Sequence, residues 1–84
     1  MTKRERLDAV IAILLARGLT IKKIVRPRGD DVDPEILLID KRVIQVGLRS
    51  IMLYGVPTRR GVIGSLLQTF SHPHELSNYL LPTP

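Results

Sequence analysis

The sequence predicts a two-layer α+β fold, with an N-terminal helix, an antiparallel meander of three to four strands and two C-terminal helices. Apolar residues recur with helical spacing behind a capping motif at the N-terminus. β-rich segments separated by turn formers fill the middle of the chain, and helical spacing returns after Pro57. With 84 residues, we expect a single small α+β domain, residues 1–84.

The N-terminal helix is predicted by both its cap and its apolar stripe. Thr2 and Glu5 have the S/T-x-x-E spacing of a capping box, in which each side chain accepts a hydrogen bond from the other residue's backbone N–H. Gly18 suits the left-handed position just past a helix end. The apolar side chains between them fall at i, i+3, i+4, i+7 and i+8: Leu7, Val10, Ile11, Leu14 and Leu15. We expect this stripe to face the core.

The first two strands are predicted on either side of an acidic loop. Leu19–Arg26 is β-rich and should end at Pro27, because proline cannot donate to a sheet ladder. Residues 28–34 are dense in turn formers and should form an exposed loop. Ile36–Ile39 is an uninterrupted apolar run, so we expect it to be buried on both faces of the sheet.

The rest of the meander is predicted from its turn residues. Asp40-Lys41 can form a two-residue hairpin turn, after which Arg42–Val46 returns as a strand. Gly47 permits a bend or a bulge, and Ser50–Tyr54 continues as a strand. Residues 55–57 contain Gly and Pro and should end the sheet.

Two helices are predicted after the sheet. Thr58 can cap the first of them, and Pro73 at the first turn of the second predicts a short helix through Leu80. Gly61 and Gly64 weaken the first helix by about 1 kcal/mol each relative to Ala, which implies close packing or another contact there. Its apolar side chains have helical spacing: Val62, Ile63, Leu66, Leu67 and Phe70.

Charge and composition narrow the class of protein. The net charge of +5 arises from three blocks, because residues 1–28 and 41–84 are basic whereas residues 29–40 carry acids and no base. A basic body with one acidic loop is typical of proteins that meet phosphate or an acidic protein surface. The hydrophobic content of 44% is high for so small a globule, so we expect some aliphatic side chains in a homodimer interface.

Several other classes of protein lack support in the sequence. There is no Cys for a disulfide framework or a thiolate zinc site, and no apolar run approaches the roughly 20 residues of a membrane helix. We therefore expect a cytoplasmic protein without membrane contact. No catalytic motif and no phosphate-binding glycine loop occur, so we expect neither an enzyme nor a cofactor.

The sharpest local feature is the pair Arg59 and Arg60, directly after Thr58. Cations in the first turn of a helix oppose its dipole by about 0.3–1 kcal/mol each. A bound phosphate would offset this cost, because backbone N–H groups and two guanidinium groups would converge on one anion. The alternative is that both arginines lie in solvent, or pair with the acidic loop or with a partner's carboxylate.

Further cations can extend this site into a stripe that follows a nucleic-acid backbone. The additional residues that we expect to bind nucleic acid or another anion are Lys22, Arg26, Arg42 and Arg49. Stacking on single strands is not expected, because the aromatic residues are only Tyr54, Phe70 and Tyr79.

Two other clusters resemble metal ligands but have simpler explanations. The carboxylates of the acidic segment lack the EF-hand spacing, so a solvated loop that can dock on a basic face is favoured: Asp30, Asp31, Asp33 and Glu35. His72 and His74 flank Pro73 without a third ligand nearby, so helix-capping or surface histidines are favoured. We expect no metal site.

Two functions are compatible with these observations. The first is a small basic nucleic-acid-binding or regulatory protein that contacts phosphates through Arg and Lys. The second is a small protein-binding adaptor or inhibitor, of the kind found among accessory proteins of phages or mobile elements. It would dock the same arginines on an acidic protein surface, with aliphatic side chains at the buried centre. The surroundings of Arg59 and Arg60, either a continuous positive surface or an apolar patch, would distinguish the two.

Overall fold

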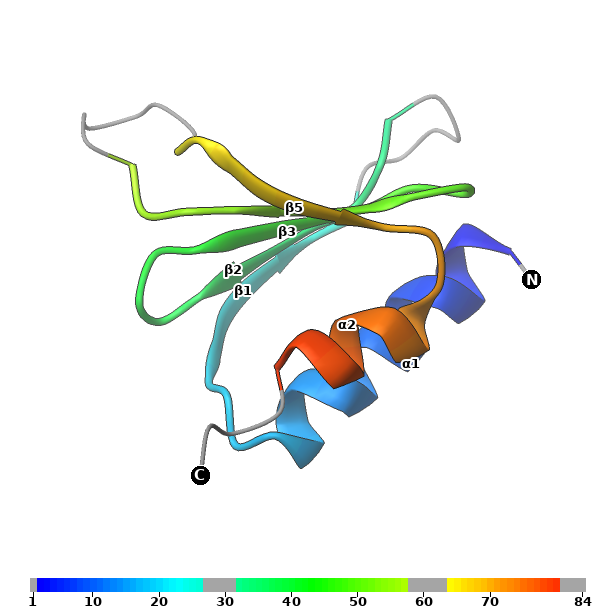
Figure 1. Cartoon of the computed structure of the whole chain (residues 1–84), viewed down its shortest axis with the longest axis horizontal. Coiled ribbons are helices and arrows are strands. Elements are labelled where there is room, and N and C mark those ends of the chain that lie inside the picture. The colour runs from blue at the N-terminus through cyan, green and yellow to red at the C-terminus, as the bar shows by residue number, and fades with distance from the viewer. Residues whose placement is uncertain (1, 27–31, 58–63, 81–84) are drawn as a thin grey trace.

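The computed structural model describes residues 2–26, 32–57 and 64–80. In chain order they form α1 (Lys3–Ala16), β1 (Ile21–Val25), β2 (Glu35–Leu38), β3 (Val43–Val46), β4 (Ile51–Tyr54), β5 (Leu66–Phe70) and α2 (Pro73–Tyr79). The strands form one antiparallel sheet in the order β1-β2-β3-β4-β5, and both helices lie on the same face of it (Figure 1). The α+β prediction is confirmed, but the described residues form five strands rather than three to four, and two helices rather than three.

Helix α1 begins and ends as predicted. The Glu5 backbone N–H donates to Thr2 Oγ1 at 3.1 Å, and the Thr2 N–H donates to Glu5 Oε1 at 3.2 Å, which completes the capping box. Gly18 has φ +76° just beyond the last turn. Most of the apolar stripe faces the sheet, with Leu15 left 60% exposed. The buried members are Leu7, Val10 and Leu14, and Ile11 packs against them.

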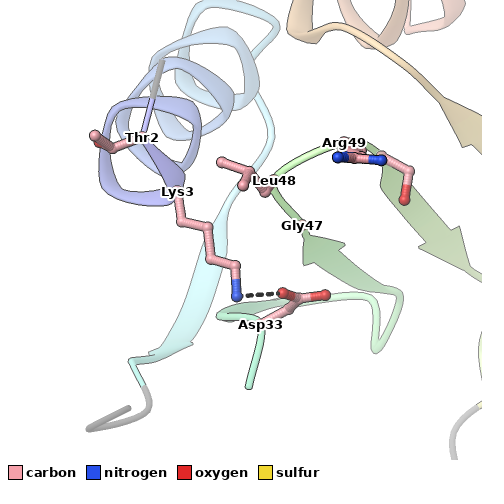
Figure 2. A pocket seen from close by; sticks show the side chains of 7 residues that line it. Thr2, Lys3, Asp33, Gly47, Leu48 and Arg49 are labelled. Atoms are coloured by element: carbon pink, nitrogen blue, oxygen red, sulfur yellow. Dashed lines mark ion pairs between the residues drawn. The ribbon is translucent and has the colours of Figure 1, made fainter. Parts of the chain in front are cut away.

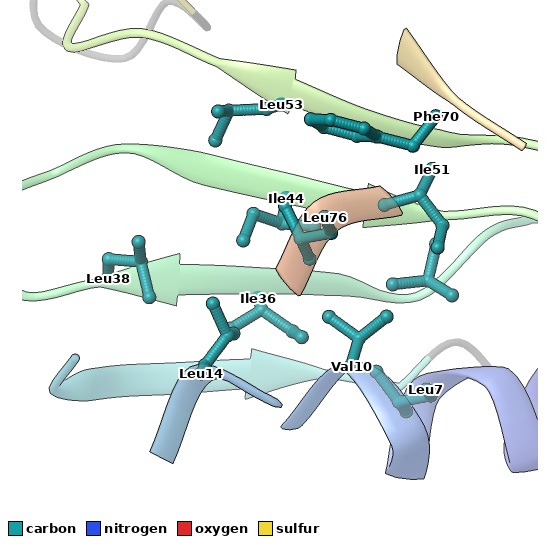
Figure 3. Packing of buried hydrophobic residues seen from close by; sticks show 11 residues of the cluster. Leu7, Val10, Leu14, Ile36, Leu38, Ile44, Ile51, Leu53, Phe70 and Leu76 are labelled. Carbon is teal, nitrogen blue, oxygen red and sulfur yellow. The ribbon is translucent and has the colours of Figure 1, made fainter. Parts of the chain in front are cut away.

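The core lies between the helices and the sheet. Side chains from α1 and α2 meet the inward-facing residues of four strands, β2 to β5 (Figure 3). Each fully buried aliphatic side chain contributes about 1.5–3 kcal/mol to folding. The largest fully buried residues are Val10, Leu14, Ile36, Leu38, Ile44, Val46, Ile51, Leu53 and Leu76.

Helix α2 follows β5 and packs beside α1, as predicted for a short last helix beginning at Pro73. Leu76 anchors it in the core, and the Tyr79 ring meets the Phe70 ring edge-on with centroids 5.4 Å apart. Arg17 at the end of α1 donates from Nη2 to Ser77 Oγ at 3.0 Å, which links the two helices. Over the part of the chain that is described, no helix is long and apolar enough to cross a membrane.

The prediction that Ile36–Ile39 is buried on both faces is wrong. Ile36 and Leu38 are buried, Leu37 is half-buried, and Ile39 is 65% exposed because it belongs to the following turn. The helices cover only one face of the sheet, so β2 alternates between the core and the uncovered face like an ordinary antiparallel strand. We call this uncovered side the open face.

The β2–β3 turn has three residues, so the predicted two-residue turn at Asp40-Lys41 is wrong. Leu38 and Arg42 form the closing pair, since the Leu38 N–H donates to the Arg42 carbonyl oxygen at 2.9 Å. The Lys41 N–H donates to the Leu38 carbonyl oxygen at 3.0 Å, and Lys41 has φ +77°. This matches a tight turn followed by a left-handed residue, which is the common three-residue hairpin.

The helix predicted from Thr58 is wrong for Leu66–Phe70, which instead forms β5 beside β4. Residues 55–57 therefore do not end the sheet, and the Gly55 N–H donates to the Ser65 carbonyl oxygen at 2.9 Å. Gly64 lies so close to Gly55 that a Cβ on it would overlap the Gly55 carbonyl oxygen. Glycine at position 64 thus allows the segments that flank β4 and β5 to approach closely. Thr58 and Gly61 lie outside the described residues.

Candidate functional site

The described candidate cations lie at opposite ends of the sheet. Lys22 is near the start of β1 and Arg42 directly precedes β3, so both lie at the end that carries the β2–β3 turn. Arg26 follows β1 and Arg49 lies in the β3–β4 turn, so both lie at the other end. The sheet thus separates two pairs of cations, and only β1 carries a candidate at each end.

Arg59 and Arg60 fall between β4 and β5, in a segment outside the described residues. Tyr54 at the end of β4 pairs with both Val43 and Leu66, so the chain leaves and re-enters the sheet at the end of the β2–β3 turn. The structure therefore does not describe the surroundings of these two arginines, which would distinguish the two functional hypotheses.

Three cations lie along the β1 edge of the sheet, Lys22 and Lys23 on the strand and Arg26 directly after it. Lys22, Lys23 and Arg26 are all exposed, and among the described residues no ion pair forms with any of them. At about 3.3 Å per residue, Lys22 and Arg26 are separated by roughly 13 Å of strand. Double-stranded DNA carries one charge per about 1.7 Å of axis, so this edge is long enough to meet several phosphates. We call Lys22, Lys23 and Arg26 the β1 cations.

Arg42 is held by its own hairpin. Its Nε donates to Asp40 Oδ2 at 2.8 Å, and its backbone N–H donates to Asp40 Oδ1 at 3.0 Å. The side chains of the pair are 25% and 47% exposed. Exposed ion pairs contribute little to stability, but this one orients the guanidinium along the turn. Arg42 therefore meets an anion only with a carboxylate beside it, which weakens it as a phosphate ligand.

An open pocket of about 670 Å³ lies between the start of α1 and the β3–β4 turn (Figure 2). Lys3 Nζ and Asp33 Oδ1 form an ion pair of 2.9 Å at its wall. Arg49 lines the pocket from the turn, so its described charges are two cations and one carboxylate. The lining residues are Thr2, Lys3, Asp33, Gly47, Leu48, Arg49 and Ser50.

The acidic segment is partly docked on the protein itself. Asp33 pairs with Lys3, and its Oδ2 would lie 3.1 Å from a Cβ on Gly47. Glu35 belongs to β2 and lies opposite Gln45, while Asp30 and Asp31 are outside the described residues. Across residues 2–26, 32–57 and 64–80, no three His, Cys, Asp or Glu side chains gather as metal ligands would.

The two histidines lie on the surface at the start of α2. His72 occupies the N-cap position but its side chain makes no capping hydrogen bond. The His72 and His74 rings stack at a centroid distance of 5.6 Å, and both residues are exposed. They are surface residues rather than caps.

Arg6 was not among the residues expected to matter, yet it is the one buried charged side chain in the described part of the chain, at 6% exposure. Its Nε donates to the Gly47 carbonyl oxygen at 2.8 Å, and its Nη2 donates to the Ser71 carbonyl oxygen at 2.9 Å. The sequence carried a signal for this burial, because Arg6 precedes Val10 and Leu14 at steps of four on the buried stripe. Its hydrogen bond to Gly47 fixes the backbone of a residue that lines the pocket.

The open face carries an apolar row across the sheet. Neighbouring strands place Leu37 opposite Val43, Val43 opposite Tyr54 and Tyr54 opposite Leu66. The first three of these residues are half-buried and Leu66 is 52% exposed. Lys23, one of the β1 cations, continues the row because it pairs with Leu37. Apolar surface and exposed positive charge therefore adjoin on this face.

Comparisons with protein-family models, with curated proteins and with solved structures find no match to this chain.

Proposed function

We propose that this protein is a small nucleic-acid-binding or regulatory protein that contacts phosphates through the β1 cations, Lys22, Lys23 and Arg26. The observation that carries the proposal is that these three side chains are exposed along the β1 edge of the sheet, with no ion pair to other described residues. Cations without protein partners retain their full attraction for phosphate and release counterions when they bind it. The proposal extends to Arg49, Arg59 and Arg60, and to Arg42 as a weaker contact.

The proposed ligand is a double-stranded or folded nucleic acid read through its backbone. Tyr54 lies on the open face, whereas Tyr79 lies on α2 and contacts Phe70. Successive bases cannot stack on aromatic rings that lie on opposite sides of the sheet. Backbone contacts hold a nucleic acid in place without reading its sequence, so weak base preference is part of the proposal.

A second candidate function, docking on an acidic protein surface, is favoured by the open face. Leu37, Val43 and Tyr54 offer an apolar centre next to Lys23 at its rim, which is the usual arrangement of a protein interface. A small adaptor or inhibitor would use this face, and its complementary partner would carry carboxylates around an apolar patch.

In either case we propose a cytoplasmic binding protein that acts without catalysis or cofactor, and as a homodimer.

The proposal is tested by binding of the purified protein to duplex DNA, single-stranded DNA and RNA over a salt series. We expect binding to duplex or folded nucleic acid that weakens as salt rises, and that Lys22→Gln/Arg26→Gln weakens further. Arg59→Ala/Arg60→Ala, compared in parallel, reports whether the β4–β5 connection belongs to the same site. Absence of binding even at low salt would overturn the nucleic-acid proposal. If the protein instead binds a protein partner, and Val43→Glu abolishes that binding, the result would support the second candidate.

A further inference from the structure

The two edge strands of the sheet differ in charge. Edges expose unpaired N–H and C=O groups, and proteins commonly protect them with lysines, bulges or proline. Both β1 and β5 contain a register irregularity, so this feature does not distinguish them. β1 carries Lys22 and Lys23, whereas β5, with the sequence LLQTF, carries no charged residue. The β5 edge therefore lacks the electrostatic protection of the β1 edge.

Strand β5 is also exposed and apolar for an edge. Its first four residues are exposed, with Leu66 at 52% and Leu67 at 51%. Only Phe70, at its end, is buried. Two exposed leucines beside a row of unpaired backbone groups form a surface that another β-strand can cover. The added strand would form hydrogen bonds with the backbone groups and cover the leucines.

We propose that β5 pairs antiparallel with β5 of a second copy of this chain, so that the two sheets join into one. A second copy is the occupant that the charge distribution favours. The β1 cations lie four strands away, about 19 Å across the sheet at roughly 4.8 Å per strand. The neighbouring strand β4, with the sequence IMLY, is uncharged as well. Two copies of a chain with net charge +5 can therefore meet at β5 without placing strand cations opposite one another.

The β5 sequence is also suited to a two-fold axis at Gln68. In that register Gln68 faces Gln68 of the second copy, and the two amide side chains can donate to and accept from each other. Leu67 then lies opposite Thr69 of the second copy, and both residues are exposed. The contact is isologous, since each copy contributes the same strand, and it closes at two copies. Each unprotected edge thereby covers the other.

The test is the mass of the purified protein in solution, measured by sedimentation equilibrium over a wide concentration range. We expect wild-type protein to form dimers and both Gln68→Lys and Gln68→Glu to weaken association about tenfold or more, because like charges then face each other at the two-fold axis. Mixing the two variants should restore a dimer containing one of each. Val25→Lys, which adds the same charge at the exposed β1 edge, should leave the dimer intact.

Circular dichroism establishes that each variant remains folded, and the rescue by mixing stands independently of any loss of stability in one of them. A wild-type protein that stays monomeric throughout the range overturns the proposal. A dimer that persists in both Gln68 variants would also overturn the proposal. The interface would then lie on another surface, such as the open face. Nucleic-acid binding is measured separately with the β1 cations, so the two proposals fail independently.

Discussion

The guanidinium of Arg6 on α1 donates from Nε to the carbonyl oxygen of Gly47, 2.8 Å away in the β3–β4 turn. Its Nη2 also reaches the carbonyl oxygen of Ser71, between β5 and α2. A single buried side chain therefore joins the N-terminal helix to two segments that are 41 and 65 residues distant in sequence. Backbone carbonyls, rather than carboxylates, receive its hydrogen bonds.

Replacing Arg6 should destabilise the fold more than its lost charge suggests. In Arg6→Met the side chain remains long and apolar, but the two carbonyl oxygens lose their donor in a buried setting. We expect the free energy of unfolding to fall by about 2–4 kcal/mol, measured by urea denaturation. Arg4→Met, an exposed neighbour on the same helix, should change it by less than about 0.5 kcal/mol. Equal effects of the two substitutions would show that the Arg6 contacts contribute little.

The capping box makes the stability of α1 depend on pH. Hydrogen bonding to the Thr2 backbone N–H, and to a lesser extent to the Thr2 side chain, lowers the pKa of Glu5. A carboxylate with a lowered pKa stabilises the folded state above its unfolded pKa, about 4.3 for Glu. That contribution is lost as pH falls through the lower, folded value. We expect Glu5→Gln to melt below the wild type at neutral pH, with the difference in melting temperature shrinking on acidification. A difference that is constant with pH would contradict this account.

The β2–β3 turn contains a removable backbone strain. Lys41 has φ +77°, a conformation that costs roughly 1–2 kcal/mol for residues with a Cβ and little for glycine. Glycine loses more entropy on folding, so Lys41→Gly should stabilise the protein by about 0.5–1 kcal/mol. Lys41→Ala separates the backbone effect from loss of the lysine side chain, and should give no such gain. Thermal unfolding of the three proteins decides the matter, and a stabilised Lys41→Ala would refute the strain explanation.

The β4–β5 hairpin requires glycine at one position. A Cβ on Gly64 would overlap the carbonyl oxygen of Gly55, so Gly64→Ala must push the two segments apart. Gly18→Ala is a suitable comparison, because its Cβ would enter open space and only the strain at φ +76° opposes it. We expect Gly18→Ala to lower stability by about 1–2 kcal/mol and Gly64→Ala by more. The reverse order in urea denaturation would argue against a tight hairpin.

The parts of the fold that the sequence predicted correctly are those with redundant local signals. For α1, the Thr2–Glu5 capping box, the apolar stripe and Gly18 all indicate the same helix. For α2, Pro73 and the following apolar residues suffice. In each case neighbouring residues indicate the helix, and packing against the core stabilises it.

Strand β5 could not be predicted in the same way. Leu66, Leu67 and Phe70 fit a helical spacing, and as an exposed edge strand β5 does not alternate between buried and exposed residues. What decides its conformation is pairing with β4, a contact that the local pattern does not contain. The apolar run at Ile36–Ile39 misleads for a related reason, because burial depends on which face the helices cover.

The candidate site was only partly accessible to sequence reasoning. Counting charges identified Lys22 and Arg26, which the structure leaves exposed. It could not distinguish them from Arg42, whose guanidinium is held by Asp40, or detect the buried role of Arg6. Those differences arise from tertiary contacts and turn geometry.

The most direct test of the central claim is the salt dependence of duplex-DNA binding by wild type and by Lys22→Gln/Arg26→Gln. Each phosphate contact contributes about 0.9 to the slope of log affinity against log salt. We expect the double variant to have a slope shallower by about two. Arg4→Gln/Lys41→Gln, which removes the same charge from other exposed positions, should keep the wild-type slope. Equal slopes for all three proteins, or no binding at low salt, would contradict the claim that the β1 cations contact phosphates.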